Sequence, residues 1–172
     1  MQPKTPAEKV LNKLLKEPFT AHTVLSLAKM LDMDKQGVWK VLNELLKKNL
    51  IKRAFVRNDE TNSVVIKIDW SIRTEKALVL FLAQEKPESS SFAELENKVL
   101  FLIQDGDNLL AVINKRSFEA VEKAAANVII FTEMEFSQEL KKRKYIEMIK
   151  NGIILYGQEN YVQFIRKIQQ NI

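Results

Sequence analysis

The apolar residues of the first 70 positions recur at two different spacings. In the first part they return every three or four residues, which predicts amphipathic helices over Pro6–Glu17, Thr20–Leu31 and Asp34–Lys48. They then alternate with polar residues, which predicts strands over Leu50–Arg57 and Ser63–Trp70, joined by a polar tip. The pattern therefore predicts three helices followed by a β-hairpin.

Residues with strong local preferences mark the ends of these helices. Pro6 suits a first helical position after Thr5, and the first helix is expected to end before Pro18. Thr20 or Thr23 can cap the second helix, and Asp34 is a good N-cap for the third helix. Asn49 can stop that helix because asparagine tolerates the left-handed backbone conformation.

The next segment predicts a helix that is apolar on more than one side. This helix covers Ser71–Lys86, and two of its sides must be buried. Burial between two domains and a contact in a dimer explain the second apolar side equally well. Pro87–Ser91 is rich in Ser and reads as a linker. We therefore expect domains over 1–70 and 92–172, connected by 71–91.

Residues 92–172 mix short apolar runs with helical spacing. Two runs flank Asp105-Gly106-Asp107, a strong hairpin signal. The predicted result is a small α/β domain with a mixed sheet, and an α+β class for the chain as a whole. Its expected strands are Val99–Gln104, Asn108–Asn114, Asn127–Thr132 and Ile153–Tyr156, and its expected helices Ser117–Ala126, Met134–Leu140, Lys144–Asn151 and Gln158–Gln170.

The positive charge is concentrated in one short stretch. The net charge is +5; residues 71–172 hold 14 Lys and Arg against 14 Asp and Glu, whereas residues 29–57 hold 8 against 3. A local cationic patch favours a phosphate-binding surface, although a solvated lysine-rich face would give the same count. Lys141–Lys144 is a second basic run. Acidic residues nearby on the same helix are expected to form salt bridges with it, and a nucleic-acid contact is the alternative.

The third predicted helix turns polar side chains away from the core. Lysine can reach a guanine edge or a phosphate, and Gln or Asn can pair with adenine in a major groove about 12 Å wide. Gly37 would let a phosphate approach the backbone, or would allow tight helix packing. The candidate contacts of this helix are Lys35, Gln36, Trp39, Lys40, Asn43 and Lys47.

Other candidates flank this helix. An outward Trp39 suggests a ligand contact, whereas a Trp39 folded over the hairpin would belong to the edge of the core. The single histidine, His22, is expected to be a capping or surface residue rather than a metal ligand. The remaining candidate DNA contacts are Thr20 and Thr23 before the second helix, and Lys52, Arg53 and Arg57 on the hairpin.

Three short motifs in order resemble the winged-helix regulators of bacteria and archaea. They are Leu27-Ala-Lys-Met-Leu31, Val38-Trp-Lys-Val-Leu-Asn-Glu-Leu45 and Leu50-Ile-Lys-Arg53, and Asn49 stands where many relatives have glycine. The resemblance covers about residues 6–70. It implies a transcriptional regulator that binds double-stranded DNA as a homodimer; winged helices that bind protein or RNA are the alternative.

A second resemblance covers roughly residues 95–160. Asn127-Val-Ile-Ile-Phe-Thr-Glu-Met-Glu-Phe136 and Ile149-Lys-Asn-Gly-Ile-Ile-Leu-Tyr-Gly157 look like the end of minimal nucleotidyltransferase domains, which in archaeal chains sometimes follow a winged helix. Those enzymes need a Gly-Ser loop and paired carboxylates for Mg²⁺, and residues 95–115 have no Gly-Ser. Asp105 and Asp107 are the nearest carboxylates. We therefore expect a catalytically silent domain that dimerises or binds a protein or small ligand, with a Mg²⁺-dependent nucleotidyltransferase as the rival hypothesis.

The composition of the chain excludes several kinds of functional site and of protein. The absence of Cys excludes disulfides and thiolate metal sites, and one His argues against a histidine-based metal site or triad. We expect no catalytic residues, metal or cofactor. No apolar run follows a basic start, and the longest apolar run, Ala77–Ala83, is far below the ~20 residues that span a bilayer. These features predict a cytoplasmic protein with no membrane partner.

Overall fold

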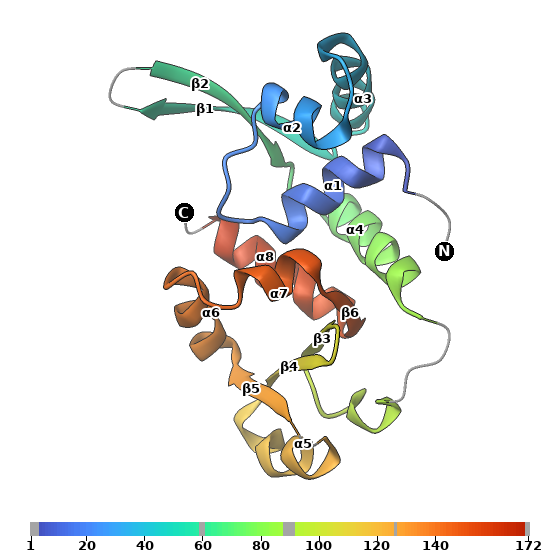
Figure 1. Ribbon diagram of the computed structural model, residues 1–172, viewed down its shortest axis with the longest axis vertical. Coiled ribbons are helices and arrows are strands. Elements are labelled where there is room, and N and C mark those ends of the chain that lie inside the picture. Colours follow the sequence, from blue (N-terminus) through green and yellow to red (C-terminus); the bar gives the residue numbers. More distant parts are fainter. Residues whose placement is uncertain (1–3, 59–60, 88–91, 126, 171–172) are drawn as a thin grey trace. The chain divides into compact units, whose positions relative to one another are not determined.

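The computed structural model describes residues 4–58, 61–87, 92–125 and 127–170, and it divides the chain into two compact units (Figure 1). The first unit is Met1–Glu75 and the second is Lys76–Ile172. The boundary between them falls inside helix α4, Ile72–Glu85. Most of the predicted linker Pro87–Ser91 lies outside the described residues.

The first unit has the three helices and the hairpin that the apolar spacing predicts. The helices are α1 (Pro6–Lys16), α2 (Val24–Leu31) and α3 (Lys35–Lys47). The hairpin joins β1 (Ile51–Asn58) and β2 (Thr61–Ile68) in antiparallel register, with Ile51 opposite Ile68.

Two predicted boundaries in this unit were wrong. Helix α2 begins at Val24 rather than Thr20, because His22 is extended and its carbonyl accepts a 2.8 Å hydrogen bond from the backbone N–H of Ile66 in β2. Strand β2 covers Thr61–Ile68 rather than Ser63–Trp70, since pairing with β1 ends at Ile68. Thr23 also caps α2 through reciprocal hydrogen bonds with Ser26, so a local preference contributes to the first correction, whereas the second comes from strand pairing.

Local preferences do set the ends of the helices. Thr5 caps α1 through a reciprocal pair of hydrogen bonds with Glu8, and the Asp34 carboxylate accepts a 2.6 Å bond from the N–H of Gly37. Asn49 has a φ of 54°, which confirms the left-handed stop after α3. The fully buried core of this unit includes Leu15, Leu27, Leu42, Leu45, Ile51, Ile66 and Ile68.

The second unit contains a four-stranded mixed sheet, which confirms the α+β class. The strand order is β5-β4-β3-β6; β4 and β5 run parallel, and the other neighbours are antiparallel. The strands are β3 (Phe101–Asp105), β4 (Asn108–Ile113), β5 (Val128–Thr132) and β6 (Ile153–Tyr156). The helices besides α4 are α5 (Phe118–Ala124), α6 (Glu133–Lys141), α7 (Ile146–Asn151) and α8 (Gln158–Gln170), with short 3₁₀ turns at Ala93–Leu95 and Lys115–Ser117.

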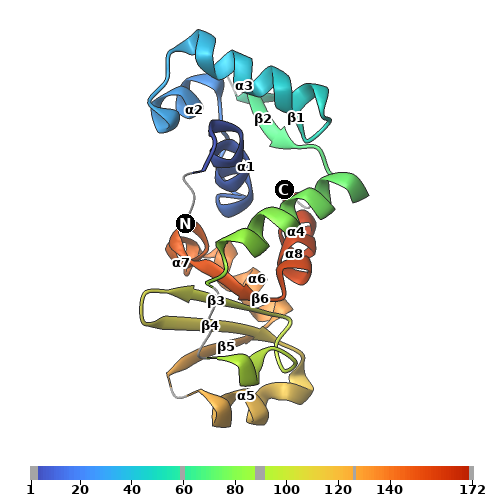
Figure 2. The same ribbon diagram turned by 90° about the vertical axis from the view of Figure 1, so that its right-hand side faces the viewer.

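Helices cover both faces of this sheet (Figure 2). On one face, Phe101 of β3 contacts the rings of Tyr161 and Phe164 from α8 and of Phe136 from α6. On the other face, Val121 of α5 belongs to an apolar cluster that contains Leu102 of β3 and three alternate residues of β4, namely Leu109, Ala111 and Ile113. Because β5 is an outer strand, all five of its residues are only partly buried.

One glycine allows a close backbone approach in this unit. Gly157 has a φ of +72°, and a Cβ at this position would lie 1.8 Å from the carbonyl oxygen of Leu100. Only glycine fits this turn between β6 and α8. Among the described residues, no helix is both long enough and apolar enough to cross a membrane.

Candidate nucleic-acid interface

Helix α3 presents a polar exposed side and an apolar buried side. Val38, Leu42 and Leu45 are at most 2% exposed. Five of the six candidate residues on this helix are exposed to solvent: Lys35, Gln36, Lys40, Asn43 and Lys47. The outer side of α3 therefore offers three ammonium groups and two amides, together with the carboxylate of the exposed Glu44.

Trp39, the sixth candidate, lies against the hairpin. Its side chain is half-buried, and the guanidinium carbon of Arg53 in β1 lies 4.7 Å from the centroid of its ring. This distance is within the range of a cation–π interaction. The geometry agrees with the alternative that Trp39 folds over the hairpin, and it joins a candidate of α3 to a candidate of β1.

The hairpin places its three candidate cations on two faces. Arg53 and Arg57 are exposed and share one face, because side chains alternate along a strand. Lys52 is on the opposite face, paired with Lys67 of β2. The structure therefore brings Arg53 and Arg57, but not Lys52, to the face that contacts Trp39.

Sequence analysis missed an apolar residue on this face. Phe55 lies between Arg53 and Arg57 in β1 and is 81% exposed, and Val64 directly opposite in β2 is 37% exposed. The signal was present in the chain, since Arg53, Phe55 and Arg57 occur at every second position. We call Arg53, Phe55, Arg57 and Val64 the hairpin stripe.

Of the two candidates before α2, Thr23 has a structural role. The Thr23 hydroxyl accepts a 3.1 Å bond from the N–H of Ser26 and caps α2, while Thr20 is exposed. The expectation that His22 is a capping or surface residue was wrong, because it is 3% exposed and its backbone pairs with β2.

Burial and the neighbouring Glu17 have opposite effects on the pKa of His22. Its Nε2 lies 3.6 Å from a carboxylate oxygen of Glu17. Burial lowers the pKa of His22 below its ordinary value of 6.5, and the Glu17 carboxylate opposes this only in part.

The side chains of Met33 and Asp34 lie close to Gly37. A Cβ on this residue would lie 2.9 Å from Cε of Met33, and its N–H already donates to the Asp34 carboxylate. The phosphate-approach alternative is therefore not supported at this position.

The second unit places the two candidate aspartates in a tight turn. Asp105 pairs with Asn108 at the end of the β3–β4 hairpin, and Gly106 and Asp107 form the tip. Within the part of the chain that the structure describes, no cluster of three or more His, Cys, Asp or Glu residues could hold a metal ion.

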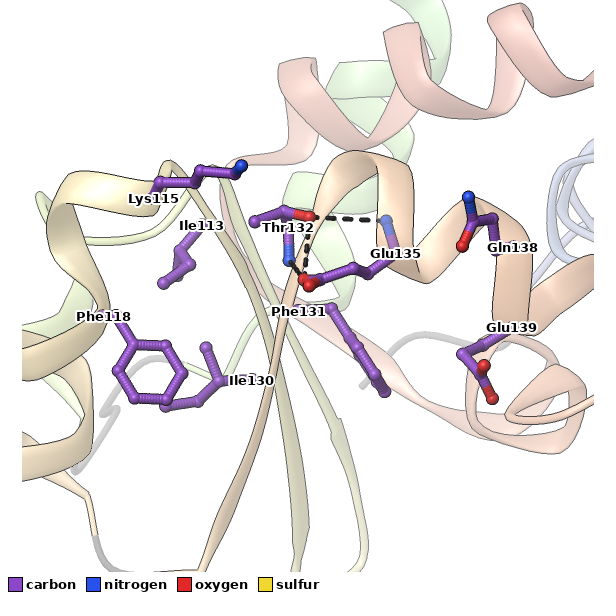
Figure 3. A pocket seen from close by; sticks show the side chains of 9 residues that line it. All are labelled: Ile113, Lys115, Phe118, Ile130, Phe131, Thr132, Glu135, Gln138 and Glu139. Carbon is purple, nitrogen blue, oxygen red and sulfur yellow. Dashed lines mark hydrogen bonds between the residues drawn. The ribbon is translucent and has the colours of Figure 1, made fainter.

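A cavity of about 460 Å³ lies at the carboxyl ends of the parallel strands β4 and β5 (Figure 3). Its polar groups are largely paired within the protein. The Glu135 carboxylate accepts 2.8 Å bonds from the backbone N–H and the hydroxyl of Thr132, and this pairing lowers its pKa. Glu139 pairs with Lys142 and Lys144 at 2.8 and 3.2 Å, which agrees with a salt-bridged Lys141–Lys144 run.

Comparison of the chain with protein-family models, with curated proteins and with solved structures found no match.

Proposed function

We propose that the first unit is a winged helix-turn-helix that binds double-stranded DNA, and that the protein is a transcriptional regulator. The observation that carries this proposal is the exposed side of α3, where Lys35, Lys40 and Lys47 accompany Gln36 and Asn43. A single helix fits the major groove, where amides and ammonium groups can contact base edges and phosphates.

The topology of the first unit supports this assignment. Helix α1 is followed by the extended residue His22, which pairs with β2, and then by α2, α3 and the hairpin. This order places one isolated β-bridge, at His22, beside the two-stranded hairpin, and the polar side of α3 stays exposed. In a winged helix, α3 would be the recognition helix and the hairpin would be the wing.

The location of the charge supports a polyanionic partner. Residues 29–57, which contain α3 and most of β1, hold 8 Lys and Arg against 3 Asp and Glu. Residues 71–172 have no net charge. A protein-binding winged helix has no requirement for such a local excess, so the charge favours nucleic acid.

We further propose that the protein acts as a homodimer through helix α4, which begins in the first unit and continues into the second, and that the second unit contributes to dimerisation rather than catalysis. Two large apolar side chains of α4, Ile72 and Leu80, are 74% and 66% exposed. A second copy of the chain would cover them. Dimerisation would also place two recognition helices on one duplex.

Duplex binding is tested by fluorescence anisotropy with a labelled random-sequence pool, followed by sequencing of the bound fraction. Wild-type protein is expected to bind and to enrich a motif. The variant Lys35→Ala/Lys40→Ala is expected to bind at least 10-fold more weakly at ~100 mM salt, since it loses two phosphate or base contacts. The matched control Arg116→Ala/Lys123→Ala removes two exposed charges from the second unit and is expected to bind like wild type. Absence of wild-type binding at low salt, or equal binding by the two variants, would refute the proposal.

A further inference from the structure

The two parallel strands of the second unit lead to helices on opposite faces of the sheet. After β4 the chain continues to α5, whose Val121 packs in the apolar cluster on one face. After β5 it continues into α6, whose Phe136 contacts Phe101 on the other face. Ligands of open α/β sheets bind where adjacent parallel strands diverge in this way, outside their carboxyl ends. The cavity of about 460 Å³ lies at this point, and small-molecule sites have volumes of roughly 300–1,000 Å³.

Apolar side chains line the cavity on the side of the strands and of α5. Ile113 ends β4, Ile130 and Phe131 lie near the end of β5, and Phe118 begins α5. The Phe118 ring is 47% exposed, so it has apolar surface that a ligand can cover. Removal of this surface from water favours a ligand with an apolar group.

Three polar groups of the cavity keep hydrogen-bonding capacity after pairing within the protein. Glu135 accepts both bonds from Thr132 on one oxygen, Oε2, and no hydrogen bond from another described residue reaches its Oε1. The ammonium group of Lys115 and the amide of Gln138 also form no hydrogen bond or salt bridge with described residues. The bonds from Thr132 hold the pKa of Glu135 below its ordinary value, so the carboxylate is charged at neutral pH.

The charges at this cavity select a ligand that is both cationic and anionic. The Glu135 carboxylate sits in the cap of α6, where it repels a phosphate, and Glu139 is already paired with two lysines. One anion, Glu135, and one cation, Lys115, are therefore left for a ligand. The charge of Lys115 also lowers the pKa of Glu135 without a salt bridge between them, which leaves room for a ligand's two charged groups. Figure 3 shows the two side chains reaching the cavity from different elements.

We propose that this cavity binds a free α-amino acid with an apolar side chain, as its zwitterion. The ammonium group of the ligand donates to Glu135, and its carboxylate accepts from Lys115. The ligand's side chain packs against Phe118 and Ile130, and the Gln138 amide can bond to either charged group. The site lies within the second unit, so this inference goes beyond the proposed function and does not require that the first unit binds DNA.

Binding is tested by isothermal titration calorimetry of the full chain with L-leucine, L-isoleucine, L-methionine and L-phenylalanine. At least one of these probes is expected to bind. Glycine, which lacks the apolar group, is expected to bind at least 10-fold more weakly, and so are analogues of the bound probe without its ammonium or without its carboxylate group. Equal binding of either analogue would overturn the zwitterion, and no binding of any of the four probes at ~10 mM would overturn the site.

Two variants test the charged residues. Glu135→Gln removes the negative charge but can keep the cap of α6, because glutamine also serves at this position of a capping box. Lys115→Met changes an exposed residue that makes no bond with a described residue, so it leaves the α6 cap intact. Each is expected to weaken binding at least 10-fold, through loss of one hydrogen bond between charged groups. The matched controls Glu119→Gln and Lys123→Met alter exposed residues of α5 that do not line the cavity, and both are expected to bind like wild type.

Chemical shifts of the backbone amides locate the bound amino acid. Addition of the probe that binds is expected to shift the amides of Lys115, Phe118 and residues 130–139, and to leave those of the first unit unchanged. Wild-type affinity in both Glu135→Gln and Lys115→Met, or shifts confined to other residues, would overturn this inference. Duplex binding is measured separately on the same protein, so its failure would refute the proposed function and leave this inference standing.

Discussion

Removing Lys35 and Lys40 tests how the proposed DNA interface works, because its effect is visible in the salt dependence of binding as well as in affinity. Each phosphate neutralised by Lys or Arg releases counterions, so that log K falls with log salt by about 0.9 for each contact. Five exposed cations lie on the outer side of α3 or on the stripe face of the hairpin: Lys35, Lys40, Lys47, Arg53 and Arg57.

These five contacts set the expected magnitudes. If all five contact phosphates, the slope is about −4.5 for wild type and about −2.7 for Lys35→Ala/Lys40→Ala. Between ~50 and ~200 mM salt, the affinity is then expected to fall roughly 500-fold for wild type and roughly 40-fold for the variant.

The assay is anisotropy of one labelled duplex over a series of KCl concentrations. Arg116→Ala/Lys123→Ala is the control for net charge, and it is expected to keep the wild-type slope because both residues lie in the second unit. The reasoning is refuted if the two double variants give the same slope. It is also refuted if the wild-type slope is near zero, since the cations would then make no phosphate contacts.

Three further predictions concern stability, each measured by urea unfolding of the full chain. As the pH falls from about 7.5 to about 5.5, the wild type is expected to lose free energy of unfolding that His22→Gln does not lose. Burial holds the pKa of His22 below 6.5, so the unfolded chain takes up a proton at higher pH than the folded chain; equal pH dependence of the two would contradict this. Gly157→Ala is expected to lower the free energy of unfolding by about 2 kcal/mol or more, since its Cβ would overlap the carbonyl of Leu100. Gly106 has a φ of +57° and open space around it, so Gly106→Ala is expected to lower it by only about 1–2 kcal/mol through backbone strain. Equal losses in the two variants would refute the steric argument. Tyr161→Phe is expected to leave stability unchanged or raise it by about 1 kcal/mol, because this fully buried hydroxyl makes no hydrogen bond within the described residues, and a clear loss would indicate a partner.

Elements governed by local chemistry could be predicted from the sequence, and elements governed by distant pairing could not. Asp34 and Asn49 act within a turn of α3, so the start and stop of that helix follow from residue preferences. Thr23 caps α2 locally, but the extended backbone of His22 just before it pairs with Ile66, a residue far away in the chain. Periodicity in the α2 segment alone contains no information about that pairing.

Some features of the candidate site follow from the sequence pattern, and others depend on contacts between elements. Helical periodicity is enough to separate the exposed Lys40 from the buried Leu42. It cannot show that Trp39 lies under Arg53, because that contact depends on how β1 meets α3. The alternation of side chains along a strand is enough to place Phe55 on the same face as Arg53 and Arg57. The apolar patch that Phe55 forms with Val64 depends on the pairing of β1 with β2.

The outer strand β5 has a consequence for the behaviour of the protein in concentrated solution. Its residues Val128–Thr132 are uncharged, contain no proline and leave one row of backbone hydrogen-bonding groups without a neighbouring strand in the sheet. Short, apolar edges of this kind are templates for intermolecular β-pairing, and natural sheets commonly protect them with lysine or proline. Conditions that loosen the second unit would therefore promote association through β5 before the hydrophobic core itself is exposed.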